Sequence, residues 1–129
     1  MHIRRKLIAM TMLMSTLVLA SPPTAAQAAA WDCPSGSLCI WTGTYGTGSR
    51  CAWSNADNDW YGGSVACSWA SSRPYRSVWN RGTSSSYFGV WIYGGANYTG
   101  SYDCIPQGDR HSASEGYARS HRWRTNACW

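Results

Sequence analysis

The sequence predicts an all-β protein, a disulfide-stapled sandwich of two sheets with Greek-key connections. No window places apolar residues at the helical spacing i, i+3, i+4, i+7, and glycine, serine, threonine and asparagine interrupt the chain every few residues. Short runs rich in β-branched and aromatic residues lie between these breaks, at 38–41, 77–79, 90–93 and 119–124. In the last run His121 and Trp123 fall on one face. An internal repeat also favours a sandwich of two similar halves.

Two copies of about 45 residues follow one another. In each copy an aromatic residue stands seven residues before a glycine, and an Arg-Ser pair and a tryptophan follow in the same order. These residues are Trp41, Gly48, Arg76-Ser77 and Trp79 in the first copy and Tyr93, Gly100, Arg119-Ser120 and Trp123 in the second. We expect one Greek-key motif in residues 31–82 and another in residues 87–129, joined near Gly82 to Ser86.

Residues 1–30 have the layout of a secretory signal peptide. A basic start, Arg4 to Lys6, precedes an apolar run, Leu7 to Ala20, and small-residue cleavage sites end at Ala28 and Ala30. The apolar run is shorter than the roughly 18 residues of a membrane-spanning helix, and no later stretch approaches that length. The sequence therefore predicts a secreted domain, residues 31–129, with no membrane partner.

The mature composition excludes some partners and limits the core. Removal of Arg4, Arg5 and Lys6 leaves eight arginines, no lysine and six acidic residues, a net charge of +2. Because this net charge is small and the basic residues form no run, the sequence predicts no nucleic-acid partner. Residues 31–129 contain seven aliphatic residues larger than alanine and eighteen aromatic residues, so aromatic rings must help to fill the core. We expect a monomer.

Six cysteines in an exported chain of this size predict a disulfide framework. Zinc binding is the alternative, but no Cys-x2-Cys pair occurs. Because the repeat then keeps each pair within one motif, we favour sequential pairing among the fifteen formal possibilities. The expected disulfides are Cys33–Cys39, Cys51–Cys67 and Cys104–Cys128.

The segment Tyr93 to Gly100 predicts a folded-over hairpin. Tyr93 can close over the bend, Gly94-Gly95 can take positive φ, and Gly100 leaves room beneath a ring. The spacing of Tyr93, Tyr98 and Gly100 resembles the Greek-key signature of the βγ-crystallins. The first copy departs from it, because Tyr45 comes early and Gly46 stands where the second ring belongs.

The mature start, Cys33-Pro34-Ser35-Gly36-Ser37-Leu38-Cys39 followed by an aromatic strand, resembles the streptomycete-type metalloproteinase inhibitor family. The resemblance implies a small secreted βγ-crystallin-like protein that is not an enzyme and that inhibits thermolysin-like metallopeptidases through an exposed reactive loop. In that family the reactive bond follows a cysteine and leads into an aliphatic residue, which places the candidate at Cys104-Ile105. The alternative is that Ile105 is a strand residue beside a structural disulfide.

Crystallin-like modules also imply calcium binding through paired Asn/Asp residues followed by Ser/Thr-Ser. The corresponding stretches here, 72–77 and 115–120, carry arginine where an oxygen ligand belongs. The shifted match at 80–85 has the same defect. We therefore expect no metal site and no cofactor, with calcium binding absent or very weak.

Catalytic motifs are missing from the sequence, since neither Gly-x-Ser-x-Gly nor His-Glu-x-x-His occurs. Asp57 and Asp59 could act as paired glycosidase carboxylates, although their context favours an exposed turn. A carbohydrate-binding or cell-wall-associated module is the second functional hypothesis, because indole faces stack on sugars and Trp53, Trp60-Tyr61 and Trp69 cluster in one loop region.

Overall fold

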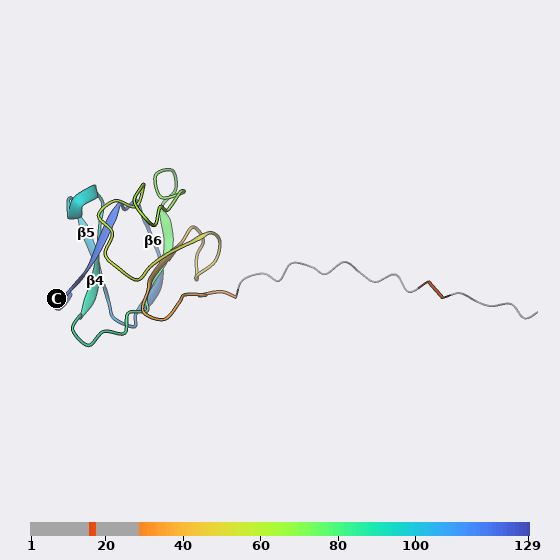
Figure 1. The fold of residues 1–129 in the computed structure, drawn as a ribbon, viewed down its shortest axis with the longest axis horizontal. Helices are drawn as coiled ribbons and strands as arrows, with labels where there is room; N and C mark the ends of the chain where they lie inside the picture. Colours follow the sequence, from red (N-terminus) through yellow and green to blue (C-terminus); the bar gives the residue numbers. More distant parts are fainter. Residues whose placement is uncertain (1–15, 18–28) are drawn as a thin grey trace, which may run out of the picture.

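The computed structural model describes residues 16–17 and 29–129, so most of the predicted signal peptide lies outside the described residues (Figure 1). Within 29–129 the chain forms two antiparallel sheets, and this confirms the all-β prediction. The first has the order β2-β1-β3-β6 and the second β5-β4-β7. The elements are β1 (Leu38–Trp41), β2 (Arg50–Trp53), β3 (Tyr75–Asn80), β4 (Gly89–Tyr93), the 3₁₀ turn η1 (Ala96–Tyr98), β5 (Tyr102–Pro106), β6 (Arg110–Gly116) and β7 (Ser120–Arg124).

The two halves of the chain exchange segments between the sheets. Strand β6 follows β5 in the chain but pairs with β3 in the other sheet. Reciprocally, Asp57 of the first half forms an isolated bridge with His121 of β7 in the second sheet. This exchange is a Greek-key connection, and it links the two repeats through the backbone as well as through the core.

The main core lies between the sheets. Leu38 and Ile40 of β1 face Val90 and Ile92 of β4 there, together with buried Trp60. Since side chains alternate along a strand, Cys39 and Trp41 point to the opposite face of β1. They form a second cluster there with Cys33, packed against Trp31 and Trp79. Strand β1 is consequently buried on both faces, because the segment that begins at Trp31 covers its outer side.

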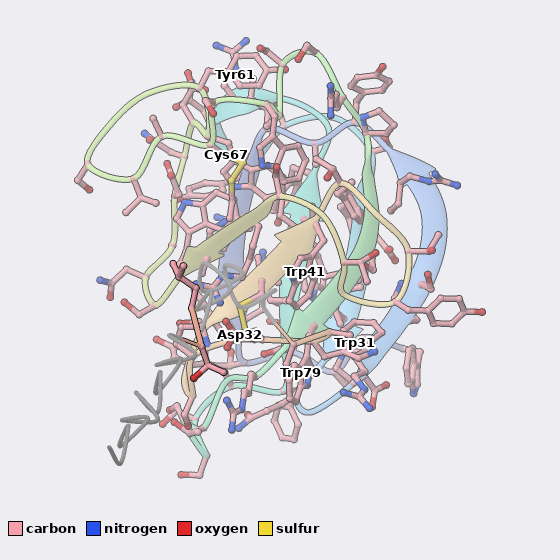
Figure 2. The ribbon with its side chains drawn as sticks, turned by 90° about the vertical axis from the view of Figure 1, so that its right-hand side faces the viewer. Trp31, Asp32, Trp41, Tyr61, Cys67 and Trp79 are labelled. Atoms are coloured by element: carbon pink, nitrogen blue, oxygen red, sulfur yellow. A yellow bond between two sulfur atoms is a disulfide. The ribbon has the colours of Figure 1, made fainter. Side chains whose placement is uncertain are left out.

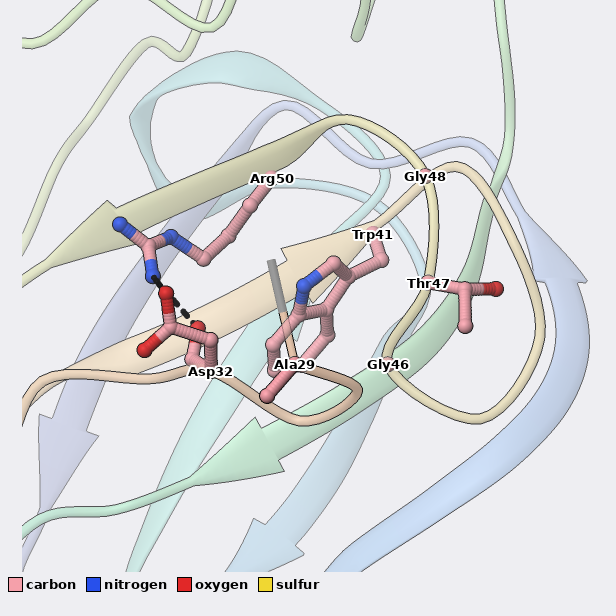
Figure 3. Close-up of a pocket in the computed structure, with 7 residues that line it drawn as sticks. All are labelled: Ala29, Asp32, Trp41, Gly46, Thr47, Gly48 and Arg50. Carbon is pink, nitrogen blue, oxygen red and sulfur yellow. Dashed lines mark hydrogen bonds and ion pairs between the residues drawn. The ribbon is translucent and has the colours of Figure 1, made fainter. Parts of the chain in front are cut away.

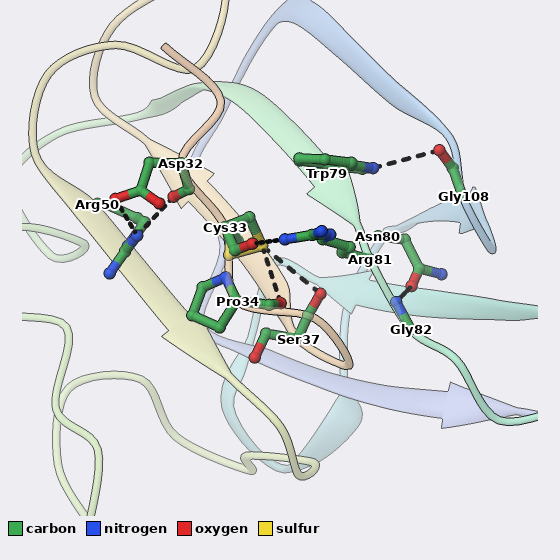
Figure 4. The surroundings of a disulfide bond; sticks show 11 residues. Asp32, Cys33, Pro34, Ser37, Arg50, Trp79, Asn80, Arg81, Gly82 and Gly108 are labelled. Atoms are coloured by element: carbon green, nitrogen blue, oxygen red, sulfur yellow. Dashed lines mark hydrogen bonds and ion pairs between the residues drawn. A yellow bond between two sulfur atoms is a disulfide. The ribbon is translucent and has the colours of Figure 1, made fainter. Parts of the chain in front are cut away.

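Three disulfides reinforce this arrangement, each within one repeat: Cys33–Cys39, Cys51–Cys67 and Cys104–Cys128. Around the first (Figure 4), the guanidinium of Arg81 donates to the carbonyl of Cys33, and the backbone N–H of Arg81 donates to Ser37 O at 2.9 Å. The opening loop is thereby fastened to the end of β3. Such cross-links matter in a domain whose core contains few aliphatic residues.

The same serine contact closes the opening hairpin of both repeats. In the first, Ser77 Oγ accepts from the N–H of Gly46 at 2.9 Å and donates to the carbonyl of Gly43 at 2.7 Å. In the second, Ser120 Oγ accepts from the N–H of Tyr98 at 3.1 Å and donates to the carbonyl of Gly95 at 2.6 Å. The serine of each Arg-Ser pair thus has one structural role in both copies.

The backbone of the second hairpin differs from the prediction that Gly94-Gly95 take positive φ. Gly94-Gly95 does not have positive φ; the positive values occur at Asn97 (56°), Tyr98 (60°) and Gly100 (84°). Gly95 is needed for space, because a Cβ there would approach Thr99 Oγ1 to 2.5 Å. Gly100 is needed for its backbone conformation rather than for room beneath a ring.

The first hairpin obtains its second ring from elsewhere in the chain. Trp31 packs edge-on against Trp41 with 5.4 Å between ring centroids, as Tyr98 does against Tyr93 at 5.9 Å. A Cβ on Gly46 would come within 2.5 Å of the Trp31 backbone nitrogen. Figure 2 shows Trp31 below Trp41, next to Trp79, in the lower part of the view. Gly46 therefore leaves the space that Trp31 fills.

Candidate functional site

The structure places the expected reactive-site pair in a strand, which corrects the expectation of an exposed loop. Cys104 and Ile105 lie in β5, and Ile105 pairs with Val90 and is fully buried. The Ile105 carbonyl accepts a hydrogen bond from Asn80 Nδ2 at 2.9 Å. Because β5 pairs with β4 along its whole length, alternation turns the Ile105 side chain into the core while Cys104 faces outward to Cys128. Ile105 cannot enter a peptidase subsite from this position.

The tryptophans proposed as sugar-binding faces also have structural roles. Trp53 and Trp60 are buried and stacked on each other, with 4.7 Å between their centroids. Trp69 is half-buried against the same core. Tyr61 is exposed, but the guanidinium of Arg119 lies over its ring at 4.2 Å. The aromatic cluster that suggested carbohydrate binding is mostly interior.

Asp57 and Asp59 organise a turn. The Asp57 carboxylate accepts hydrogen bonds from Trp53 Nε1 and from the Asp59 N–H, both at 2.9 Å. Asp59 receives two hydrogen bonds from Arg119, also at 2.9 Å. Arg119 and the N–H of Tyr61 lower the Asp59 pKa from its ordinary value. The lowered pKa of Asp59 is the opposite of the raised pKa of a glycosidase acid, and the hydrogen bonds of both carboxylates fit the expected turn.

Beneath this turn, His121 joins the first half of the chain to β7. Its Nδ1 accepts from Trp60 Nε1 at 2.8 Å, and its Nε2 faces the carbonyl of Asn55 at 2.9 Å. The ring lies 5.3 Å from that of Trp123, on the same face of β7. Burial lowers the pKa of His121 to about 4, partly offset by the hydrogen bond to Asn55. The neutral ring acts as a structural connector.

These contacts form the base of the stapled loop, which we define as residues 61–66 between Trp60 and Cys67. The N–H of Cys67 donates to the carbonyl of Trp60 at 2.7 Å, and Cys67 is bound to Cys51 of β2. Both flanking residues are buried, whereas every residue of the loop except half-buried Gly62 is exposed. Figure 2 shows this pale yellow-green segment arching away from the strands between the labelled Tyr61 and Cys67.

A groove of about 450 Å³ lies beside the stapled loop. Gly63, Ser64 and Val65 line part of it, and the segment 54–58 lines another part. The groove leaves open space between these parts of the stapled loop and the segment 54–58. A partner could approach the loop without first displacing other side chains.

A second groove, of about 610 Å³, adjoins Ala29 near the predicted signal cleavage sites (Figure 3). Trp41 and the turn 46–48 form much of its lining, and the ion pair Asp32–Arg50, at 3.1 Å, crosses it. Its two charged groups neutralise each other. The lining carries no nucleophile or acid–base pair, and we assign it no chemistry.

No cluster of three or more His, Cys, Asp or Glu side chains suited to a metal occurs among the described residues. In the calcium-like stretch 115–120, the cation of Arg119 is held by Asp59. Within the same part of the chain, no helix is long and apolar enough to cross a membrane.

The model of peptidase inhibitor family I36 matches residues 26–105. The chain belongs to this family. Membership confirms the resemblance to the streptomycete-type metalloproteinase inhibitors and agrees with the prediction of a protein that is not an enzyme. The matched range of this I36 member includes the stapled loop and ends within β5.

Solved structures place the I36 member among βγ-crystallin folds. A structure from work on the evolution of the eye lens βγ-crystallin domain fold shares 11% identity and a TM-score of 0.53, covering 81% of this chain and 95% of its own. A βγ-crystallin from Ciona intestinalis shares 6% identity and a TM-score of 0.50, covering 69% of this chain and 100% of its own. At such identities the likeness concerns the fold alone. No curated protein sequence matches significantly.

Proposed function

We propose that this protein is a secreted inhibitor of a thermolysin-like metallopeptidase and that it acts by lodging an exposed loop in the active-site cleft. The observation that carries the proposal is the match of residues 26–105 to a family of peptidase inhibitors. The metallopeptidase target follows from the resemblance of the opening loop, residues 33–39, to the streptomycete-type inhibitors. Secretion is supported by the predicted signal peptide and by the disulfide-stapled fold.

The architecture suits inhibition by occlusion. Three disulfides and a two-layer core fix the surface loops before any partner arrives. A loop that is already ordered loses little conformational entropy on binding, so a short contact can still be tight. A stable complex of this kind buries roughly 1,600 Å² in total, and a domain of this size can supply its half of that area.

A panel of purified peptidases tests the proposal. The mature protein, residues 31–129, is titrated against zinc, serine and cysteine peptidases. We expect stoichiometric loss of activity for a thermolysin-like enzyme and no effect on the serine or cysteine enzymes. Absence of inhibition across the panel would sink the proposal, and selective inhibition of a serine peptidase would refute the metallopeptidase target.

Among the described residues, the contacts of Trp53 and Trp60 do not favour carbohydrate binding. Trp53 and Trp60 are buried, so neither can offer a free indole face to a sugar ring. Incubation of the same protein with insoluble polysaccharide provides the comparison. We expect it to stay in the supernatant.

A further inference from the structure

Residues 31–129 contain seven aliphatic side chains larger than alanine, and Val65 of the stapled loop differs in exposure from the other six. Those six are at most 2% exposed and fill the core. Val65, in contrast, is 43% exposed. In a domain with so few aliphatic residues, a branched side chain left outside the core contributes little to folding and is available to a partner.

The two ends of the stapled loop are held by separate contacts. At one end, Trp60 is fully buried and bonded to His121, and its N–H donates to the carbonyl of Arg119 at 2.7 Å. At the other end, the disulfide to Cys51 holds buried Cys67. A cut within residues 61–66 would leave both new ends attached to the domain. This geometry favours tight binding and opposes the release of a cleaved product.

The backbone between these ends is free to pair with a partner. Among the described residues, the N–H groups of residues 63–66 donate no hydrogen bond. The Val65 carbonyl accepts one long contact, 3.4 Å from Trp53 Nε1. A peptide in a peptidase cleft binds by adding an extended strand, which requires such unpaired backbone groups. The loop is also uncharged, which suits a hydrophobic subsite.

Phe88 is a competing candidate, because it is an apolar side chain that is 62% exposed and precedes β4. Its backbone, however, is already paired on both sides. Its N–H donates to Arg124 O and its carbonyl accepts from the Gln107 N–H, both at 3.0 Å. Phe88 therefore cannot add a strand to a cleft without breaking the edge of its own sheet.

We propose that the stapled loop is the inhibitory loop and that Val65 is the side chain that enters the hydrophobic specificity subsite of the target metallopeptidase. The inference rests on the proposed function and replaces the buried Ile105 with an exposed branched residue. If the enzyme slowly cuts its inhibitor, water adds across the Ser64–Val65 peptide bond, giving a carboxylate on Ser64 and an amine on Val65.

Substitution of Val65 tests the inference against the peptidase that wild-type protein inhibits. We expect Val65→Asp to raise the inhibition constant about 30-fold or more, as loss of a binding hot spot does. Val65→Ile is expected to stay within about threefold of wild type, since the subsite still receives a branched side chain. Phe88→Asp is the matched control and is expected to behave like wild type. Thermal unfolding verifies that all three variants fold.

Hydrogen exchange of the wild-type complex gives a second readout that needs no substitution. Amides of residues 63–66 are expected to exchange rapidly in the free protein and to become protected in the complex. Unchanged inhibition by Val65→Asp, or protection confined to other segments such as 81–88, would overturn the inference while leaving the proposed function intact. Failure of wild-type protein to inhibit any peptidase would overturn both.

Discussion

The indole nitrogen of Trp60 donates a hydrogen bond to Nδ1 of His121 across 2.8 Å. This contact ties the base of the stapled loop to β7, although the two residues are 61 positions apart. With its proton on Nε2, the neutral imidazole satisfies both Trp60 and the carbonyl of Asn55. A protonated ring would face the indole N–H with a second donor and lose that bond.

Acid is therefore expected to destabilise the domain through His121. Its pKa is lowered to about 4 by burial and returns to 6.5 on unfolding, so the unfolded chain binds the extra proton. The contribution is complete above pH 6.5 and is lost as the pH falls toward 4, by about 3 kcal/mol. Urea unfolding between pH 7.5 and 4 measures it. His111→Gln, at an exposed histidine, is expected to keep this dependence, whereas His121→Phe is expected to lack it.

Ile105 is expected to govern stability rather than inhibition. Because it is fully buried in β5, Ile105→Ala should cost about 2–5 kcal/mol of unfolding free energy, and Ile105→Val about 1 kcal/mol. Chemical denaturation gives both values. The folded Ile105→Val protein is expected to inhibit as wild type does. A stable Ile105→Ala protein that had lost only its inhibition would contradict the placement of this residue in the core.

Removal of the Cys51–Cys67 disulfide is expected to raise the inhibition constant as well as to lower the free energy of unfolding. In the double variant Cys51→Ser/Cys67→Ser, the unfolded chain gains the freedom of a loop of this length, about 3 kcal/mol in the chain-entropy model. The stapled loop also loses its fixed end, and it must be ordered when it binds. Inhibition constants and melting curves measured together separate the two effects. The double variant Cys104→Ser/Cys128→Ser is the control, expected to lose stability without a selective loss of inhibition.

The serine contacts predict matched losses in the two repeats. Ser77→Ala and Ser120→Ala each remove a hydroxyl that bonds two backbone groups of a hairpin, so we expect about 1–3 kcal/mol of destabilisation from each. Exposed Ser86→Ala is expected to change the unfolding free energy by less than about 0.5 kcal/mol. Equal stability of all three variants by thermal or urea unfolding would disprove a structural role for the hydroxyls.

Calcium is expected to leave the domain unchanged. Arg76 and Arg119 stand where the crystallin pattern requires oxygen ligands, and a fixed cation repels a divalent ion. Melting curves recorded with millimolar calcium and with a chelator are expected to superimpose. An increase of several degrees with calcium, but not with magnesium, would show that a site exists despite the arginines.

The sequence by itself determined the fold class, because local chemistry specifies it. The sequence lacks helical periodicity and contains frequent turn residues, which favours short strands. The repeated residues around Trp41 and Tyr93 favour two copies of one motif. Strand β6 was not among the predicted runs. Its residues, 110–116, are mostly polar and do not alternate; pairing with β3 makes them a strand.

Only the tertiary structure decided which aliphatic side chain is available to a partner. Ile105 and Val65 are both β-branched and both lie within two residues of a cysteine in the chain, so local sequence does not show which of them is exposed. Pairing of β5 with β4 turns Ile105 into the core. The anchors at Trp60 and Cys67 leave Val65 outside it. Burial depends on contacts between distant segments, and those contacts exist only after the sheets have assembled.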